Sequence, residues 1–425
     1  MMHVSQIEHG PGPGDTSDDA GQRIPPVPRI SIQAFCETPE LAATIQAAVS
    51  DRRMAKAQVK VNMGGAPAAV EAYRSAPTPN LVLIEFSQDR SQLVGHLDEL
   101  SQSCDSGTKV IVAGRVNDIT LYRDLIARGV SEYLVGTPNV IDFIRAVSNL
   151  YAAPGADAVG RVVTVTGAKG GVGSSTLAHN IAWSIARKLE IATVIADLDL
   201  PFGTAGLDFN QDPPQGIAEA VFAPDRLDAN LVDRLLSKCA ENLNLLAAPA
   251  TLDRNFDFSE TAFDNLIDIL RASIPCIVLD LPHMWTSWSR RMLVASDDVV
   301  IVAAPDLANL RNVKNLLDQL KTVRSNDARP RLIINGAGLL KRPEIAIADF
   351  AKAVELEPVA VIPHDAKLFG TAANNGQMIA EVEAAHKTAV IIDDLARLIA
   401  GRAEARKARK NIFEPLLARL QRRKA

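Results

Sequence analysis

Residues that could bind phosphate and a metal ion gather in one glycine-rich stretch of the chain. This stretch follows a β-branched run at positions 162–165 and precedes a segment with helical periodicity. A strand, a glycine-rich turn and a helix in that order form a phosphate cradle, because glycine lets successive N–H groups face one anion and the helix N-terminus adds its dipole. The nucleotide-binding residues expected here are Ala168, Lys169, Gly170, Gly171, Val172, Gly173, Ser174, Ser175 and Thr176.

Carboxylates end two further apolar runs. Asp197 and Asp199 follow the run at 192–196, and Asp280 follows the run at 276–279. A buried strand that ends in one carboxylate, as at Asp280, can deliver it to a Mg²⁺ ion beside a phosphate loop, where Ser175 would supply a hydroxyl ligand. An acidic pair at a strand end can also be a solvated turn, but the nearby glycine-rich loop favours a site.

The elements that must position these residues alternate regularly along the chain. Before the glycine-rich stretch, strand-like and helix-like runs alternate five times, which predicts a doubly wound parallel sheet. The expected strands are 29–35, 58–62, 80–86, 109–113 and 132–135, and the expected helices are 39–51, 66–75, 92–101, 117–128 and 141–150. We therefore expect an α/β chain of two tandem doubly wound domains.

The first of these domains resembles a response-regulator receiver, with a flavodoxin-like fold, most clearly over residues 121–135. The residues that carry receiver chemistry are missing, because Glu85 stands at the phosphoacceptor position and Gly136 replaces the lysine. The acidic pair is reduced to Glu37, and Ala113-Gly114 replaces the hydroxyl residue. Without clustered carboxylates or a cation, nothing would hold Mg²⁺ or balance an acyl phosphate. We predict a degenerate, non-phosphorylated receiver that serves in docking, with Glu85 a solvated strand-end carboxylate.

The glycine-rich stretch resembles the deviant phosphate loop of MinD/ParA ATPases, with Lys169 at the position of the family's extra lysine. The resemblance implies a nucleotide-sandwich dimer in which Lys169 reaches the partner's phosphates. It also implies that Asp197 holds the Mg²⁺ water shell and that Asp199 orients the attacking water. Ser174 departs from the family, because the usual lysine precedes the hydroxyl residue. ATP binding with Mg²⁺ is therefore expected, and slow hydrolysis at most.

Later segments around Asn335 and Pro363 extend this resemblance over residues 162–400. Asn335 ends an apolar run and resembles the family's adenine-recognising asparagine, since one carboxamide can satisfy both a donor and an acceptor of adenine. Pro363 resembles part of the wall of the base pocket. After Asp280, Trp285 and Trp288 could mark a partner site or pack beneath a helix, and packing is favoured. His283 is expected to be an ordinary loop residue.

Charge is distributed very unevenly along the chain. Residues 401–425 hold nine Lys or Arg and two Glu, a net charge of +7, so the other 400 residues carry −12 of the total of −5. Apolar residues from Ile412 to Leu420 recur at helical spacing in this tail, which resembles the membrane-targeting end of MinD. The tail could therefore bind the inner membrane surface or dock on the protein itself. The expected organisation is a disordered arm (1–28), a receiver-like domain (29–151), a linker (152–160), an ATPase domain (161–400) and a basic amphipathic tail (401–425).

A receiver-like domain fused to such an ATPase is identified as a member of the CpaE/TadZ family, which positions or assembles Tad-type (Flp) pilus machinery. This implies a homodimer, pilus or secretion proteins as partners, and a cytoplasmic location, peripheral at the inner membrane or cell pole. The alternative is a ParA-like DNA-partitioning ATPase, which needs a basic face on the ATPase domain, whereas the basic charge lies in the tail. A live signalling receiver is disfavoured by Glu85 and Gly136. No run of 18 apolar residues or signal-peptide pattern occurs, and the four cysteines lack metal-ligand spacing.

Overall fold

The chain forms two compact units, Met1–Gly155 and Ala156–Ala425, called here the first and second unit. The structure is a computed structural model that describes residues 24–87, 90–105, 107–151, 160–339 and 342–401. The predicted linker, apart from residue 160, and nearly all of the predicted tail fall outside these ranges. Within them, no helix combines the length and the apolar character needed to cross a bilayer.

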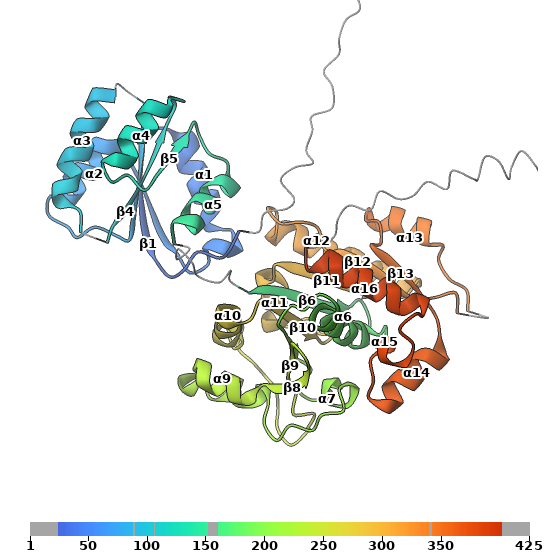
Figure 1. Ribbon diagram of the computed structural model, residues 1–425. Coiled ribbons are helices and arrows are strands. Elements are labelled where there is room, and N and C mark those ends of the chain that lie inside the picture. The colour runs from blue at the N-terminus through green and yellow to red at the C-terminus, as the bar shows by residue number, and fades with distance from the viewer. Residues whose placement is uncertain (1–23, 88–89, 106, 152–159, 340–341, 402–425) are drawn as a thin grey trace, which may run out of the picture. The chain divides into compact units, whose positions relative to one another are not determined.

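The first unit is a parallel sheet with helices on both faces (Figure 1). Its strand order is β2-β1-β3-β4-β5, and every pairing in it is parallel. The strands are β1 (Ser31–Cys36), β2 (Gln58–Met63), β3 (Leu81–Phe86), β4 (Lys109–Gly114) and β5 (Glu132–Val135). The helices are α1 (Pro39–Val49), the 3₁₀ turn η1 (Arg52–Met54), α2 (Gly65–Tyr73), α3 (Arg90–Ser103), α4 (Ile119–Ala127) and α5 (Val140–Tyr151).

Burial in this unit follows the predicted alternation. The central strand β3 is buried at every position, as expected of a parallel strand covered on both faces. One core layer joins α1 and α5 to the sheet, and a second joins α2, α3 and α4 to its other face. The expected doubly wound fold is confirmed, and the element boundaries differ from the sequence prediction by a few residues at most.

The predicted disordered arm ends earlier than expected. Ile24 and Val27 are buried in the core layer of α1 and α5. The N–H of Val27 donates to Arg53 O at 2.8 Å, and Ser148 Oγ donates to Pro25 O at 2.8 Å. The expectation of disorder is therefore wrong for residues 24–28, because the apolar side chains of Ile24 and Val27 pack into the core of the first unit. Residues 1–23 lie outside the described ranges.

Glu85 is not the solvated carboxylate that its strand-end position suggested. It is only 7% exposed. Its Oε2 accepts from the N–H groups of Glu37 at 2.7 Å and Thr38 at 2.8 Å, and its Oε1 accepts from Thr38 Oγ1 at 2.6 Å. A carboxylate at the start of α1 is also favoured by the helix dipole. Glu85 thus ties the loop after β1 to the end of β3.

The second unit is built on a larger sheet with the strand order β13-β12-β11-β6-β10-β7-β9-β8. The pairing of β8 with β9 is antiparallel, and all the others are parallel. The strands are β6 (Arg161–Gly167), β7 (Thr193–Asp197), β8 (Ser237–Ala240), β9 (Leu243–Leu246), β10 (Cys276–Leu281), β11 (Asp298–Ala303), β12 (Arg331–Ala337) and β13 (Ala360–Pro363).

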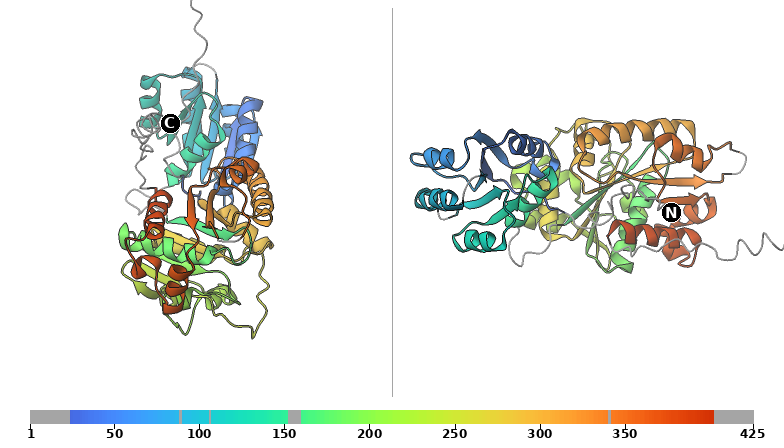
Figure 2. Two further views of the ribbon diagram at one scale, coloured as in Figure 1. Left: turned by 90° about the vertical axis from the view of Figure 1, so that its right-hand side faces the viewer. Right: turned by 90° about the horizontal axis from the view of Figure 1, so that it is seen from above.

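Helices cover both faces of this sheet too (Figure 2). One core layer contains residues of α8 to α13, and the other contains residues of α6, α7 and α14 to α16. These helices are α6 (Ser174–Lys188), α7 (Ala205–Asp208), α8 (Ile217–Phe222), the 3₁₀ turn η2 (Pro224–Arg226), α9 (Ala229–Leu235), α10 (Asp264–Ser273), α11 (Ser287–Ala295), α12 (Leu307–Val323), α13 (Ile347–Val354), α14 (Ala366–Asn375), α15 (Ile379–Val382) and α16 (Lys387–Ile399). The strand β6 lies in the middle of the sheet, so the loop that follows it is held between well-packed neighbours.

Candidate nucleotide-binding site

The loop between β6 and α6 has the backbone shape that its glycines predict. Gly171 and Gly173 have φ values of +78° and +82°, a region that side chains rarely adopt. A Cβ on Gly173 would also lie 2.6 Å from Asn335 Nδ2. The loop therefore needs glycine at position 173 both for its conformation and for the close approach of Asn335.

Side chains from the loop after β10, from α12 and from β12 hold three carbonyl groups of this loop. His283 Nδ1 donates to Gly167 O at 2.9 Å, and Asn312 Nδ2 of α12 donates to Ala168 O at 2.8 Å. Asn335 Nδ2 of β12 donates to Val172 O at 2.8 Å. The carbonyls of Gly167, Ala168 and Val172 are thus engaged by the protein itself.

The N–H groups of the same stretch are left available. From Lys169 to Thr176, none donates a hydrogen bond to any residue in the described ranges. The last three of these donors, at Ser174, Ser175 and Thr176, open α6 and carry its positive dipole end. A continuous row of unpaired N–H donors at a helix N-terminus is an arrangement suited to phosphate oxygens.

Lys169 lies on the outside of the loop with its side chain exposed. Burial alone would raise the pKa of Asp306, but hydrogen bonds from Asn309 and the charges of Lys169 and Arg342 outweigh it and lower that pKa. Ser174 is the first residue of α6 and is half-buried. The cation of the loop is thus exposed at Lys169, and the position of the usual lysine holds a hydroxyl.

The two predicted metal-binding aspartates lie side by side at the end of the sheet. Asp197 ends β7, and Asp280 lies opposite it in the neighbouring strand β10. Both are buried, with 1% and 2% of their surface exposed. Asp197 accepts hydrogen bonds from the N–H groups of Asp199 at 3.0 Å and Ala205 at 3.1 Å. The structure thus brings the two carboxylates together at one edge of the sheet.

Burial and mutual repulsion make this pair costly to ionise. Burial, and then the negative charge of Asp280, raise the pKa of Asp197 to about 7, although His179 and two backbone hydrogen bonds oppose the shift. Burial also raises the pKa of Asp199, whose carboxylate accepts from Phe202 N at 3.3 Å. Two buried carboxylates without enough positive charge favour the binding of a cation.

Asn335 and Pro363 lie on adjacent strands, and Asn335 contacts the phosphate loop at Val172. Asn335 lies in β12 and Pro363 ends β13, which pairs with β12. Because Asn335 Nδ2 is used by Val172 O, only Oδ1 remains for a base, and this atom is buried without a partner in the described structure. The amide can thus accept from an amino group, while its donor side is already committed to the loop.

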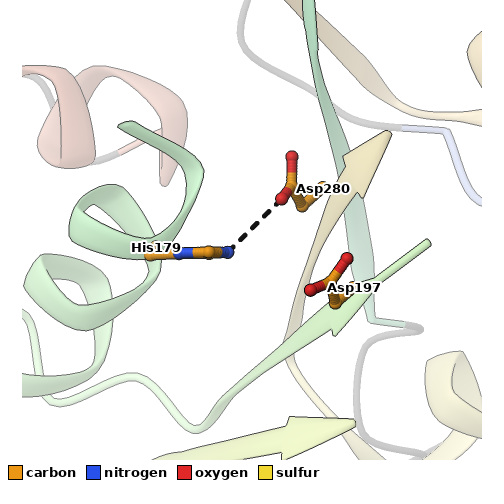
Figure 3. A group of neighbouring side chains, drawn as sticks. All are labelled: His179, Asp197 and Asp280. Carbon is orange, nitrogen blue, oxygen red and sulfur yellow. Dashed lines mark ion pairs between the residues drawn. The ribbon is translucent and has the colours of Figure 1, made fainter. Parts of the chain in front are cut away.

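No sequence pattern pointed to His179, which is fully buried on α6. Its Nδ1 lies 2.7 Å from Asp208 Oδ2, and its Nε2 lies 3.3 Å from Asp280 Oδ2. Figure 3 shows its imidazole pointing from α6 toward Asp280 and Asp197. Sequence reasoning also missed Asn312, and it took His283 for an ordinary loop residue, although both hold the loop.

The two tryptophans after β10 have different environments. Trp288 is buried and packs against Phe263, with ring centroids 5.0 Å apart. Trp285 is 52% exposed and lines a cavity of about 660 Å³ beside Gly167, together with residues of α12. The preference for packing is therefore right for Trp288 and wrong for Trp285.

Known proteins similar to this chain divide between its two units. The family model of the AAA domain matches residues 160–334. MinD, the septum site-determining protein of Helicobacter pylori, is 28% identical over 234 residues, which are 51% of this chain and 83% of that protein. A ParA family ATPase from Chlorobium tepidum is 26% identical with a TM-score of 0.52, and the match covers 56% of this chain and 98% of that one.

The N-terminal part of the chain is similar to a pilus assembly protein. The crystal structure of CpaE from Caulobacter crescentus CB15 is 50% identical, with a TM-score of 0.30, and the match covers 31% of this chain and 99% of that one.

Proposed function

The chain belongs to the CpaE family of pilus assembly proteins, within the MinD/ParA superfamily of ATPases, and from this premise we propose that it is an ATP-dependent dimerisation switch. In this proposal the switch positions or assembles a Tad-type pilus machine. The observation that carries it is the row of unpaired N–H groups from Lys169 to Thr176 at the start of α6. These donors suit the phosphates of ATP.

The residues around the loop have side chains of the types that bind ATP and Mg²⁺. Ser175 offers a hydroxyl, Asp197 and Asp280 offer buried carboxylates, and oxygen ligands are those that Mg²⁺ prefers. Mg²⁺ would neutralise charge on the phosphates, and Asp199 would orient the attacking water. Asn335 Oδ1 would accept from the adenine amino group, and Pro363 would form part of the base wall. Ser174 removes one charge-assisted phosphate contact, so we propose that hydrolysis is slow.

Exposed apolar side chains support a dimer formed over this edge. Phe202, Trp285 and Leu307 are 67%, 52% and 73% exposed. They follow β7, β10 and β11, so they surround the same edge of the sheet as the phosphate loop. A second copy would cover them and bring its Lys169 to the phosphates across the interface.

We propose pilus or secretion proteins as partners, and attachment of the basic tail to the inner membrane surface. Each Lys or Arg near anionic lipid contributes about 1 kcal/mol at most, so one tail binds reversibly. Two tails in a dimer would raise the avidity and couple attachment to ATP.

Isothermal titration calorimetry of the full chain tests nucleotide binding directly. We expect one ATP bound per chain when Mg²⁺ is present, and weaker binding in Ser175→Ala because one metal ligand is lost. Absence of any heat of ATP binding in the folded parent would refute the proposal.

A further inference from the structure

A cluster of three potential metal ligands lies directly behind the phosphate loop. His179, Asp197 and Asp280 are all buried, and their ligand atoms lie within 4.8 Å of one another. They come from three elements, because His179 is on α6, Asp197 ends β7 and Asp280 is in β10 (Figure 3). The cluster therefore combines one imidazole nitrogen with two carboxylates.

His179 Nε2, the imidazole nitrogen that faces the two carboxylates, has no hydrogen-bond partner among the described residues. His179 Nε2 is buried and makes no hydrogen bond within the described ranges, although it lies 3.3 Å from Asp280 Oδ2. The side chain as a whole is fully buried. A buried polar atom of this kind is costly unless something binds to it.

Asp208 supports the imidazole from behind. Its Oδ2 lies 2.7 Å from His179 Nδ1, and an ionised carboxylate can only accept, so Nδ1 carries a proton and donates it. This arrangement fixes the ring and directs Nε2 toward Asp197 and Asp280. Metal-binding histidines commonly donate their other ring N–H to a carboxylate in the same way.

The two carboxylates of the cluster also favour a cation. Asp197 and Asp280 are both buried, and their ligand atoms share the cluster with a single imidazole. A divalent ion would neutralise both carboxylates, which one proton cannot do.

We propose that His179, Asp197 and Asp280 together ligate one divalent transition-metal ion, with Asp208 as the outer partner of His179. The proposal rests on the proposed function only in taking Asp197 and Asp280 as metal ligands. Imidazole nitrogen suits transition ions, whereas Mg²⁺ prefers oxygen alone. The site therefore prefers a transition ion to Mg²⁺.

The observed spacing is compatible with this ligation. Three ligands that are each about 2.1 Å from one ion cannot all be more than about 3.6 Å from one another. Since no two ligand atoms of the cluster are more than 4.8 Å apart, the side chains need to close by about 1.2 Å at most. Small changes in the carboxylate rotamers supply a movement of this size.

Binding of Mn²⁺ to the nucleotide-free full chain tests the proposal. Mn²⁺ stands at the weak end of the transition series, so it is a stringent probe. We expect electron paramagnetic resonance to show one Mn²⁺ bound per chain, and an excess of Mg²⁺ to displace it poorly. Spin-echo modulation should show coupling to an imidazole ¹⁴N in the bound state.

Matched variants separate ligation from structural support. His179→Gln should lose the ¹⁴N coupling. It should also weaken Mn²⁺ binding by more than about a hundredfold, because loss of an outer partner alone typically weakens metal binding about tenfold to a hundredfold. Asp208→Asn should weaken it by about ten to a hundred times and keep the coupling. His96→Gln, in the first unit, removes an imidazole elsewhere and should change neither.

Two results would overturn the proposal. The first is that the parent binds no stoichiometric Mn²⁺, and the second is that Mn²⁺ binds without ¹⁴N coupling. Either result would leave His179 as an ion-pair partner of Asp280 only. Calorimetry with ATP and Mg²⁺ keeps the two proposals distinct. If ATP binds and Mn²⁺ does not, the transition-metal site falls alone; if Mn²⁺ binds and ATP does not, the proposed function falls alone.

Discussion

Replacement of Glu85 by alanine should destabilise the first unit strongly and leave the second unit unchanged. The carboxylate accepts three hydrogen bonds, from Glu37 N, Thr38 N and Thr38 Oγ1. At about 1.5 kcal/mol each, the low end for bonds to a charged group, their loss amounts to about 4.5 kcal/mol. Because Glu37 and Thr38 are half-buried, water recovers part of this loss, and we expect about 3 kcal/mol.

Urea unfolding of the full chain can follow the two units separately. All three tryptophans lie in the second unit, so their fluorescence reports on that unit alone. Hydrogen exchange of peptides from β1 and β3, read by mass spectrometry, reports on the first. With a urea slope of about 2 kcal/mol per molar, a loss of about 3 kcal/mol lowers the midpoint of the first unit by about 1.5 M.

Two variants calibrate this prediction. Glu85→Gln keeps one acceptor oxygen without the charge, and should fall between the parent and Glu85→Ala. Glu99→Ala removes an exposed carboxylate of α3 and should change stability by no more than about 0.5 kcal/mol. If Glu85→Ala unfolds at the same urea concentration as Glu99→Ala, the carboxylate does not hold the loop after β1, and the reasoning fails.

Further changes test other parts of the structure. Gly173→Ala should abolish ATP binding in calorimetry, because a Cβ at position 173 would lie 2.6 Å from Asn335 Nδ2. A Cβ at position 170 would meet no atom within 4 Å, so Gly170→Ala should weaken ATP binding less. Equal losses of affinity in the two variants would contradict this prediction. Trp288→Ala should cost the second unit about 3–5 kcal/mol in urea unfolding, while the exposed Trp285→Ala should change stability by about 0.5 kcal/mol or less; similar effects would argue against the packing described. After incubation with acetyl phosphate, mass spectrometry should find no phosphate on the first unit, and a phosphorylated peptide from β3 would refute the degenerate receiver.

Much of the fold could be predicted from local patterns. Apolar runs alternating with amphipathic ones specify parallel strands and covering helices, and carboxylates at the ends of such strands must share an edge. Asp197 and Asp280 could therefore be expected near the phosphate loop, although 83 positions separate them in sequence. Burial and pairing agree with this expectation.

The contacts that sequence could not reveal depend on how helices are rotated against the sheet. His179 lies within a buried stretch of α6, and no local pattern tells whether its ring faces a core or a carboxylate. Asn312 lies on α12, and only the packing of that helix brings its amide to Ala168 O. Glu85 likewise finds donors 47 and 48 positions away in sequence. Side-chain partners at such distances follow from tertiary packing.

In the proposed function, ATP brings two copies of the chain together through Lys169. Sedimentation velocity of the full chain with Mg²⁺ and ATP should show a dimer that ADP does not support. In Lys169→Ala each dimer loses two charge-assisted contacts by symmetry, about 3 kcal/mol at the least, so its dissociation constant should rise at least about a hundredfold. Lys321→Ala, an exposed lysine of α12, should dimerise like the parent. A Lys169→Ala protein that dimerises as the parent does, or a parent that stays monomeric with ATP, would contradict the account.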